Sequence, residues 1–310
     1  MKAYSLSTLT MTVADIERST AFYTQAFGCI VLFDQIFPAN SYSQLGSVSP
    51  SAVRMVTLRL GDEYIELIQY LDLEALPVPA DSRSHDLWFQ HIAIVVSDID
   101  LAYERLRSFD IRPISSGPQT IPADNPNAGG VRAFKFRDFD GHSLELIWFP
   151  TDKRRDKWDS PGDRLFLGID HSAIAVSNTA QSLAFYRDLL GLEESGQGHN
   201  TGPVQAELDG VPGADVKLTS LQTSQPKIGL ELLDYQQPGR PRPQTWQIND
   251  LSHRHLILEV DDLNTSLGIL KQHGIETTAL QIVNLPDPYR YTAGLLIKDP
   301  DGHSLLLVVL

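Results

Sequence analysis

The sequence predicts an α+β fold built from four tandem β-α-β-β-β units. The chain repeats itself: residues 19–28 (STAFYTQAFG) recur as residues 182–191 (SLAFYRDLLG), and residues 137–146 (RDFDGHSLEL) recur as residues 298–307 (KDPDGHSLLL). Repetition over such a long period indicates a duplication. A fainter repeat divides each half again, because four short β-rich runs each precede a stretch typical of a helix.

The duplication predicts two domains, residues 1–150 and residues 165–310. The segment between them, residues 150–164 (PTDKRRDKWDSPGDR), is charged and rich in turn-forming residues, as an interdomain linker should be. The first domain divides into units of about residues 1–80 and 85–150. The second divides into units of about residues 165–245 and 250–310.

Each unit is expected to open with a strand and continue into a helix. The opening strands are residues 8–13, 91–96, 171–176 and 255–260. The helices are expected near residues 16–27, 99–108, 179–190 and 263–273. Asp15, Asp98 and Asp262 stand where helix N-caps are needed. Later strands are visible at residues 54–60, 63–70, 131–137 and 143–149, and Asp-x-Asp-Gly predicts hairpin turns at residues 138–141 and 299–302.

Composition and charge exclude several classes of protein. The 310 residues are 42% hydrophobic and 21% charged, with a formal net charge of −14. An acidic surface repels phosphate backbones, so we expect no nucleic-acid partner. The longest apolar run, residues 305–310, is far shorter than a membrane span, so we expect no membrane association. The first residues lack the apolar stretch of a signal peptide, which predicts a cytoplasmic protein.

Other motifs narrow the chemistry further. Cys29 is the only cysteine, which excludes an intramolecular disulfide and a cysteine-based zinc site, and we expect it to pack as a small apolar residue. The glycine-rich nucleotide loops, the Gly-x-Ser-x-Gly elbow and the His-Glu-x-x-His motif are missing. His142 and His303 directly follow the Asp-Gly turns and are expected to be exposed.

Histidine and glutamate recur at matched positions of the repeat. His91, His171 and His255 open three of the four units, although the chain has only 9 histidines. Equivalent late-strand positions hold Glu66, Glu145 and Glu231, each between apolar residues. An ionised carboxylate in such surroundings is costly to bury unless a cation meets it. Imidazole and carboxylate are ligands for Fe, Mn, Ni, Co or Zn, so this register predicts a divalent metal ion as cofactor.

Together these features resemble the vicinal oxygen chelate superfamily, which includes glyoxalase I, methylmalonyl-CoA epimerase, bleomycin-resistance proteins and extradiol ring-cleaving dioxygenases. The strand-Asp-helix openings, the Ala-Phe-Tyr segments and the Asp-x-Asp-Gly-His-x-Leu-Glu-Leu ending carry the resemblance, which spans nearly the whole chain. It implies that the tandem units pair into two cupped mixed β-sheets with flanking helices. One metal ion is expected in a cup, held by the first and last strands of each paired unit.

Carried over residue by residue, the resemblance implies two cups, one in each half. The N-terminal cup contains Thr8, Glu66, His91 and Glu145, and the C-terminal cup contains His171, Glu231, His255 and Leu306. Thr8 offers at best a weak neutral oxygen and Leu306 offers no ligand atom. Each cup therefore differs at one position from the four-ligand pattern. A triad of His171, His255 and Glu231 is the alternative in the second cup. The N-terminal site would be nearly neutral and the C-terminal site would carry about +1, which favours Lewis-acid chemistry there. Which cup is active stays open.

The resemblance implies a metal-dependent enzyme, either a lyase or isomerase or a ring-cleaving dioxygenase, whose substrate chelates the metal through two oxygens. A ligand carboxylate would double as the proton-transferring base, and the candidates are Glu66, Glu145 and Glu231. The alternative is a metal-free, ligand-sequestering protein of the bleomycin-resistance type. The partner is expected to be a small molecule, and the chain a monomer or homodimer. The predicted pocket wall favours a partly apolar compound and consists of Tyr64, Ile68, Val95, Ile147 and Phe149.

Overall fold

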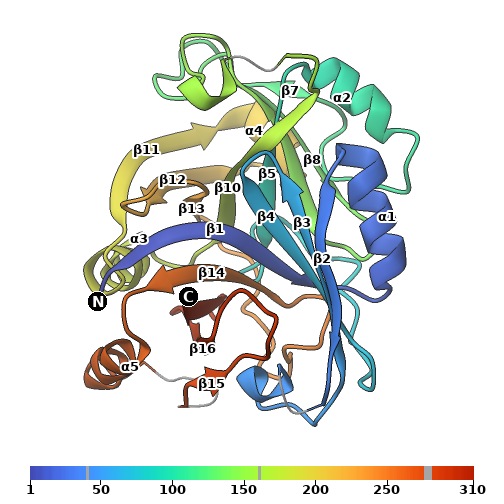
Figure 1. The fold of residues 1–310 in the computed structure, drawn as a ribbon. Coiled ribbons are helices and arrows are strands. Elements are labelled where there is room, and N and C mark those ends of the chain that lie inside the picture. The colour runs from blue at the N-terminus through green and yellow to red at the C-terminus, as the bar shows by residue number, and fades with distance from the viewer. Residues whose placement is uncertain (40–41, 160–161, 276–280) are drawn as a thin grey trace.

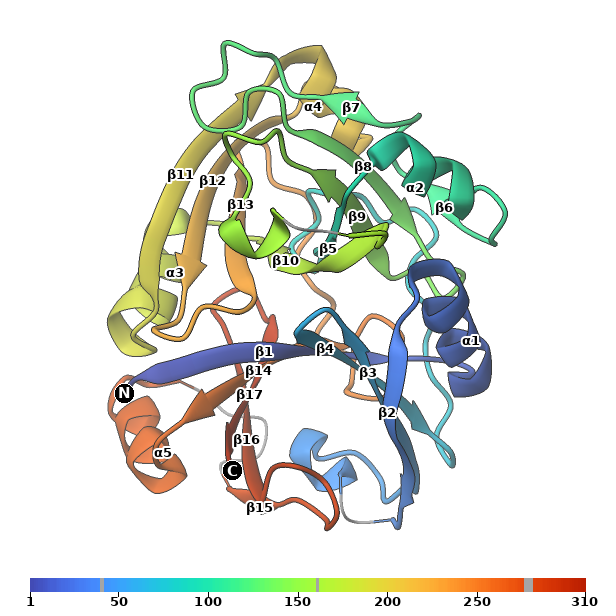
Figure 2. The same cartoon turned by 45° about the horizontal axis from the view of Figure 1, so that its top comes forward.

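The computed structural model describes residues 1–39, 42–159, 162–275 and 281–310. These residues form the predicted α+β fold, with two curved mixed β-sheets and helices at their sides. Figure 2 shows the sheets as two separate layers, with α1 and α2 at one side and α3 and α5 at the other. None of the described helices is long and apolar enough to cross a membrane.

The elements follow the four predicted units (Figure 1). The first unit contains β1 (Ala3–Thr12), α1 (Ile16–Phe27), β2 (Ile30–Phe37), the short turn η1 (Ser43–Gly46), β3 (Val53–Leu60) and β4 (Glu63–Tyr70). The second contains β5 (Gln90–Val96), α2 (Ile99–Leu106), β6 (Arg112–Pro113), β7 (Gln119–Thr120), β8 (Arg132–Arg137) and β9 (Ser143–Trp148). A short turn, η2 (Asp156–Trp158), lies in the segment that joins the halves.

The third unit contains β10 (Phe166–Ala175), α3 (Thr179–Leu183) with its wider continuation η3 (Ala184–Leu189), β11 (Glu193–Thr201), α4 (Gly202–Asp209), β12 (Asp215–Gln222) and β13 (Gly229–Tyr235). The fourth contains β14 (Arg254–Val260), α5 (Leu263–Gln272), β15 (Val283–Asn284), β16 (Ala293–Lys298) and β17 (Ser304–Val309). The helix α4 was not predicted, and it has consequences for the site.

Local signals placed the helix starts correctly. Asp15 accepts hydrogen bonds from the backbone N–H groups of Glu17 and Arg18, and Asp98 and Asp262 cap α2 and α5 in the same way. Asn178 caps α3, where the sequence offered no aspartate.

The pairing of the units differs from the prediction. The first sheet has the strand order β15-β16-β17-β14-β1-β4-β3-β2, so it joins the first and fourth units. The second sheet has the order β11-β12-β13-β10-β5-β9-β8-β6, so it joins the second and third units. The expectation that each half forms its own cup is therefore wrong. Within its own unit, each opening strand pairs along one edge and leaves the other edge free. These free edges pair between units, β1 with β14 and β5 with β10. A repeat pattern does not reveal which free edges meet, because all four opening strands carry it.

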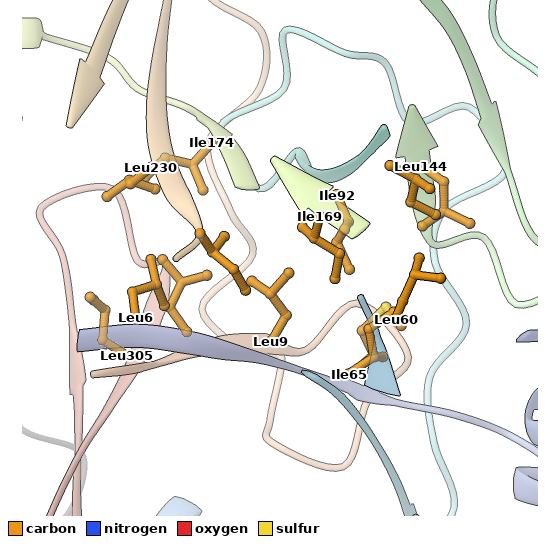
Figure 3. Close-up of a cluster of buried hydrophobic side chains, with 14 of the residues drawn as sticks. Leu6, Leu9, Leu60, Ile65, Ile92, Leu144, Ile169, Ile174, Leu230 and Leu305 are labelled. Atoms are coloured by element: carbon orange, nitrogen blue, oxygen red, sulfur yellow. The ribbon is translucent and has the colours of Figure 1, made fainter. Parts of the chain in front are cut away.

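The two sheets pack against each other through one large apolar core. Figure 3 shows Leu6, Leu9 and Leu305 of the first sheet facing Ile92 and Ile169 of the second. Side chains alternate along a strand, so the residues between these core positions point to the opposite, concave face of each sheet. His91 and Ala93 on β5 therefore lie on the face that turns away from the core.

Two buried Tyr-Asp-His groups, which we call latches, connect the sheets. In the first latch, Tyr23 on α1 donates to Asp138 Oδ2 at 3.1 Å, and His142 Nδ1 lies 3.0 Å from the same oxygen. His142 Nε2 lies 2.9 Å from the carbonyl oxygen of Thr12. The latch thus ties the first unit, in one sheet, to the second unit, in the other.

The second latch repeats this arrangement between the third and fourth units. Tyr186 donates to Asp299 Oδ2 at 2.9 Å, and His303 Nε2 lies 2.8 Å from the carbonyl oxygen of Ala175. The prediction that His142 and His303 are exposed is wrong, since their exposed fractions are 0% and 4%. The turn folds back on itself, and its aspartate and histidine reach the neighbouring unit instead of solvent.

Candidate metal centre

Strand register brings two histidines and two glutamates together on the concave face of the second sheet. In one row across the sheet, Ala93 on β5 lies between Glu145 on β9 and His171 on β10. In the adjacent row, Ala173 on β10 lies between Glu231 on β13 and His91 on β5. The alanines keep the space between the longer side chains open. We call His91, Glu145, His171 and Glu231 the His/Glu cluster.

The polar atoms of the cluster converge in a small volume. Glu145 Oε2 lies 3.2 Å from His91 Nε2 and 3.7 Å from His171 Nε2, and these three residues offer ligand atoms that all lie within 4.8 Å of one another. Glu231 Oε2 lies 3.7 Å from His171 Nε2. The cluster is well shielded, with exposed side-chain fractions of 1% for His91, 6% for Glu145, 11% for His171 and 20% for Glu231.

The donor atoms fit a metal ion. His91 Nε2 and His171 Nε2 are buried and have no hydrogen-bond partner among the described residues. Buried polar atoms without a partner are costly, and an ion coordinated by both nitrogens would remove the cost. His171 Nδ1 lies 3.0 Å from Asp170 Oδ2, which is the outer-shell contact that commonly orients a metal-binding imidazole.

The pKa values of the four cluster residues are shifted in different directions by burial and by neighbouring charges. Burial by itself raises the pKa of Glu145, but the neighbouring His91, Lys135 and His171 outweigh burial and lower it to about 2. Burial lowers the pKa of His91 to about 4. For His171, burial is outweighed by Glu231 and Asp170, and its pKa rises to about 9. Burial raises the pKa of Glu231. Glu145 is therefore ionised and His91 neutral at pH 7, the forms in which both bind metals.

The cluster lies in the wall of a cavity of about 470 Å³. Of the predicted apolar wall, Ile147 and Phe149 line this cavity, and Val95 packs behind Ile147. Tyr64 and Ile68 belong to β4 of the first sheet and do not reach it. The cavity is also lined by residues that the sequence did not single out, namely Lys135, Asp170, Gln205 and Leu208. Gln205 and Leu208 belong to α4, which is inserted between β11 and β12. Only recognition of this extra helix in the sequence could have predicted that they line the cavity.

The concave face of the first sheet holds the other four predicted positions, Thr8, Glu66, His255 and Leu306. The expected N-terminal and C-terminal cups are therefore wrong as groupings, and the expected triad of His171, His255 and Glu231 is divided between the sheets. Both departures from the ligand pattern, Thr8 and Leu306, fall in the first sheet. The second sheet consequently holds the complete set of four.

The first sheet's concave face is filled by side chains. Leu306 packs there with Tyr42, Tyr289 and Tyr291 in an apolar cluster. Tyr289 donates to Glu66 Oε2 at 2.9 Å, while His255 Nε2 lies 3.2 Å from the Tyr42 hydroxyl. His255 Nδ1 lies 3.1 Å from His253 Nε2. Among the described residues, no group of three ligands forms here, so Glu66 and His255 are not part of the candidate centre.

Comparisons with known proteins agree with this architecture. A model of the Glyoxalase/Bleomycin resistance protein/Dioxygenase superfamily matches residues 168–307, and a second model of the same superfamily matches residues 9–127. The chain is 31% identical to a 2-epi-5-epi-valiolone epimerase of an Actinomyces species over 147 residues, which are 45% of this chain and 76% of that protein. It is 28% identical to the uncharacterized protein YaeR of Escherichia coli over 141 residues, 45% of this chain and 93% of that protein.

The fold of the full chain is also similar to a solved structure. Glyoxalase I from Zea mays superposes with a TM-score of 0.62 and 17% sequence identity, over 99% of this chain and 92% of that chain. At this level of identity the likeness concerns the fold alone.

Proposed function

The chain belongs to the glyoxalase/bleomycin resistance protein/dioxygenase superfamily, and from this we propose that it is an enzyme that binds one divalent metal ion and moves a proton on a small, oxygen-rich substrate. The observation that carries the proposal is the convergence of the His/Glu cluster on one face of the second sheet. The proposed ligands are His91, Glu145 and His171, and Glu231, the fourth member of the cluster, is proposed as the base.

The donor set favours proton transfer over ring cleavage. Non-haem iron oxygenases commonly use two histidines and one carboxylate, whereas this cluster contains two carboxylates. The second carboxylate leaves a group free to act as a base. The similarity to a protein named as an epimerase supports the same choice, because epimerisation is a proton transfer at carbon. The ion would be Fe, Mn, Ni, Co or Zn, and none of these is favoured by the ligands alone.

When bound, the metal ion would polarise a carbonyl oxygen and stabilise the negative charge that develops on it during the reaction. The chain's own residues would hold the substrate and move the proton. Glu231 is the better candidate for the base, because it approaches one histidine of the cluster, His171, and is the most exposed of the four side chains. Its Oε1 accepts a hydrogen bond from the Ser220 hydroxyl at 3.3 Å. Its Oε2 would take the proton from the substrate carbon beside the carbonyl and return it. Glu145 lies close to both histidines and suits a permanent ligand better.

The rival proposal, a metal-free sequestering protein, depended on Thr8 and Leu306. Both lie on the first sheet, so they do not weaken the ligand set of the second. The cavity beside the His/Glu cluster has the size of a small-molecule site and combines apolar walls with a few polar groups, as enzyme pockets commonly do.

The proposal is tested first by metal content. Protein purified without chelator should contain close to one divalent ion per chain by elemental analysis. His91→Ala and His171→Ala should each lose that ion, whereas His255→Ala, a histidine at the equivalent position of the first sheet, should keep it. Equal metal content in all three variants would contradict the proposed ligand set.

The reaction class is tested separately. Small 2-oxo and 2-hydroxy carbonyl compounds are incubated with the protein in D₂O, and deuterium incorporation beside the carbonyl is followed by NMR. We expect incorporation that is lost in Glu231→Gln while metal is retained. Oxygen consumption with catechols, without proton exchange, would instead support a dioxygenase.

A further inference from the structure

A buried lysine lies in the wall of the same cavity, and its ammonium group has N–H donors that are not used in hydrogen bonds to the described residues. The side chain of Lys135 on β8 is 5% exposed. An ammonium group has three N–H donors, yet its only hydrogen bond among the described residues goes to Asp209 Oδ1, at 2.6 Å. Burial of such a charge with donors unused is costly unless a further acceptor binds there.

The partner of Lys135 is itself firmly held. Asp209, at the end of α4, accepts hydrogen bonds on Oδ2 from Gln205 Nε2 at 2.7 Å and from the Tyr235 hydroxyl at 2.8 Å. Because α4 belongs to the third unit and β8 to the second, the contact between Asp209 and Lys135 connects the two units that form the second sheet. Asp209 therefore fixes the Lys135 ammonium at one place in the cavity wall.

That place is next to the proposed metal ligands. Lys135 is paired with Glu145 across β8 and β9, and its Nζ lies 4.0 Å from Glu145 Oε1. The other oxygen of this carboxylate faces His91 and His171. A small molecule that occupies the cavity beside the His/Glu cluster would thus also come within reach of Lys135.

The fold does not require a cation at this position. The residues that pair with the equivalent late-strand position in the other three units are Thr57, Ser220 and Leu296. All three are uncharged, and their strands pair in the same way. A charge that appears at this position in only one of the four units, and in the wall of the cavity, points to a ligand rather than to sheet stability.

We propose that Lys135 binds an anionic oxygen of the substrate, so that the substrate is a small carboxylate or similar oxyanion that also carries metal-chelating oxygens. This inference rests on the proposed function for the metal centre and narrows its substrate class. The bound anion would accept hydrogen bonds from the N–H groups that Asp209 leaves free.

Oxalate and oxamide provide a direct test, because both can approach a metal ion through two oxygens but oxamide carries no carboxylate. Each is titrated by calorimetry into protein loaded with Mn²⁺, Ni²⁺ or Zn²⁺. Lys135→Gln keeps a donor for Asp209 and removes the charge. Since a hydrogen bond to a charged group contributes more than a neutral one, we expect oxalate affinity to fall about ten- to hundredfold. Oxamide affinity should fall much less.

Lys153→Gln is the matched control, since it removes a less buried charge from the same cavity and should have only a small effect on oxalate binding. If Lys135→Gln does not fold, the double variant Lys135→Met/Asp209→Leu removes both buried charges together and should show the same selective loss of oxalate. Equal losses for both probes, or no loss, at unchanged metal content would overturn the inference.

Metal content separates this result from the proposed function. Wild-type protein that takes up none of the three ions would contradict the metal centre itself. Oxalate is then titrated into the metal-free chain, where a dependence on Lys135 still supports the anion site and no dependence overturns it.

Discussion

At the scale of single residues, neighbours decide what each repeated glutamate does. Glu145 and Glu66 occupy equivalent late-strand positions, and both are buried. His91, Lys135 and His171 surround Glu145 and hold its pKa at about 2. Among the described residues, the donors in contact with Glu66 are the hydroxyls of Tyr289 and Thr10, and burial raises the pKa of Glu66 to about 7. The same residue in the same register is thus a proposed ligand in one sheet and a buried, easily protonated acid in the other.

Glu66 should therefore make the protein's stability depend on pH. Its pKa in the folded chain is about 7, above the ordinary value of 4.5 that holds in the unfolded chain, so the folded state binds the proton more tightly. Its contribution is fully present below pH 4.5 and is lost as pH rises through 7. We expect Glu66→Gln to raise the free energy of unfolding at pH 8 by up to about 3 kcal/mol, and to change it little near pH 4.

Urea denaturation of wild type and Glu66→Gln across this pH range measures the effect. The groups around Glu66 that also carry charge or titrate include Arg290, Tyr42, Tyr289, Tyr291 and His255, and they are the same in both proteins. A variant that is equally destabilised at every pH would show that Glu66 stays ionised when folded.

At the scale of elements, short turns do more than connect strands. The Asp-x-Asp-Gly-His turn after β8 forms the hairpin that the sequence predicts, but its aspartate and histidine also build the first latch. A sequence pattern reveals the turn because turn chemistry is local. It does not reveal the latch, because Tyr23 on α1, the partner of Asp138, and Thr12 on β1, the partner of His142, lie more than a hundred residues earlier.

Breaking the first latch should destabilise the protein strongly. Asp138→Ala leaves the Tyr23 hydroxyl and the His142 imidazole without their buried acceptor, and we expect a loss of about 3–5 kcal/mol in the free energy of unfolding. Tyr23→Phe removes one hydrogen bond and should cost only about 1 kcal/mol. Chemical denaturation compares both with Asp124→Ala, an exposed aspartate of the same unit that should be neutral. Similar values for Asp138→Ala and Asp124→Ala would contradict the structural role of the latch.

At the scale of the whole molecule, the four units form a closed ring. Sheets join the fourth unit to the first and the second to the third, and latches join the first to the second and the third to the fourth. The candidate metal centre thus lies between units of different halves. The segment between the halves also packs against both sheets, since Trp158 is buried and Lys157 pairs with Glu63 at 3.0 Å.

This arrangement predicts how the isolated halves behave. Residues 1–150 alone would leave β1 and β5 each without one neighbouring strand, and unpaired edges favour aggregation. We expect this fragment to be insoluble or self-associated when expressed alone. Co-expressed with residues 165–310, it should purify as a complex that binds metal, as judged by size-exclusion chromatography and elemental analysis. A monomeric, metal-binding N-terminal fragment would contradict the shared centre.

The sequence by itself determined the α+β class, the four units, the helix starts at Asp15, Asp98 and Asp262, and the six His and Glu positions worth considering. These follow from local rules, because alternation, capping and turn chemistry act over a few residues. The tertiary structure alone decided which units share a sheet, and therefore that His91 and Glu145 meet His171 and Glu231 while Glu66 and His255 lie on the other sheet. The physical reason is that each opening strand offers a similar free edge, and only the packing of complete units selects its partner. The same packing placed α4, and with it Asp209, beside Lys135.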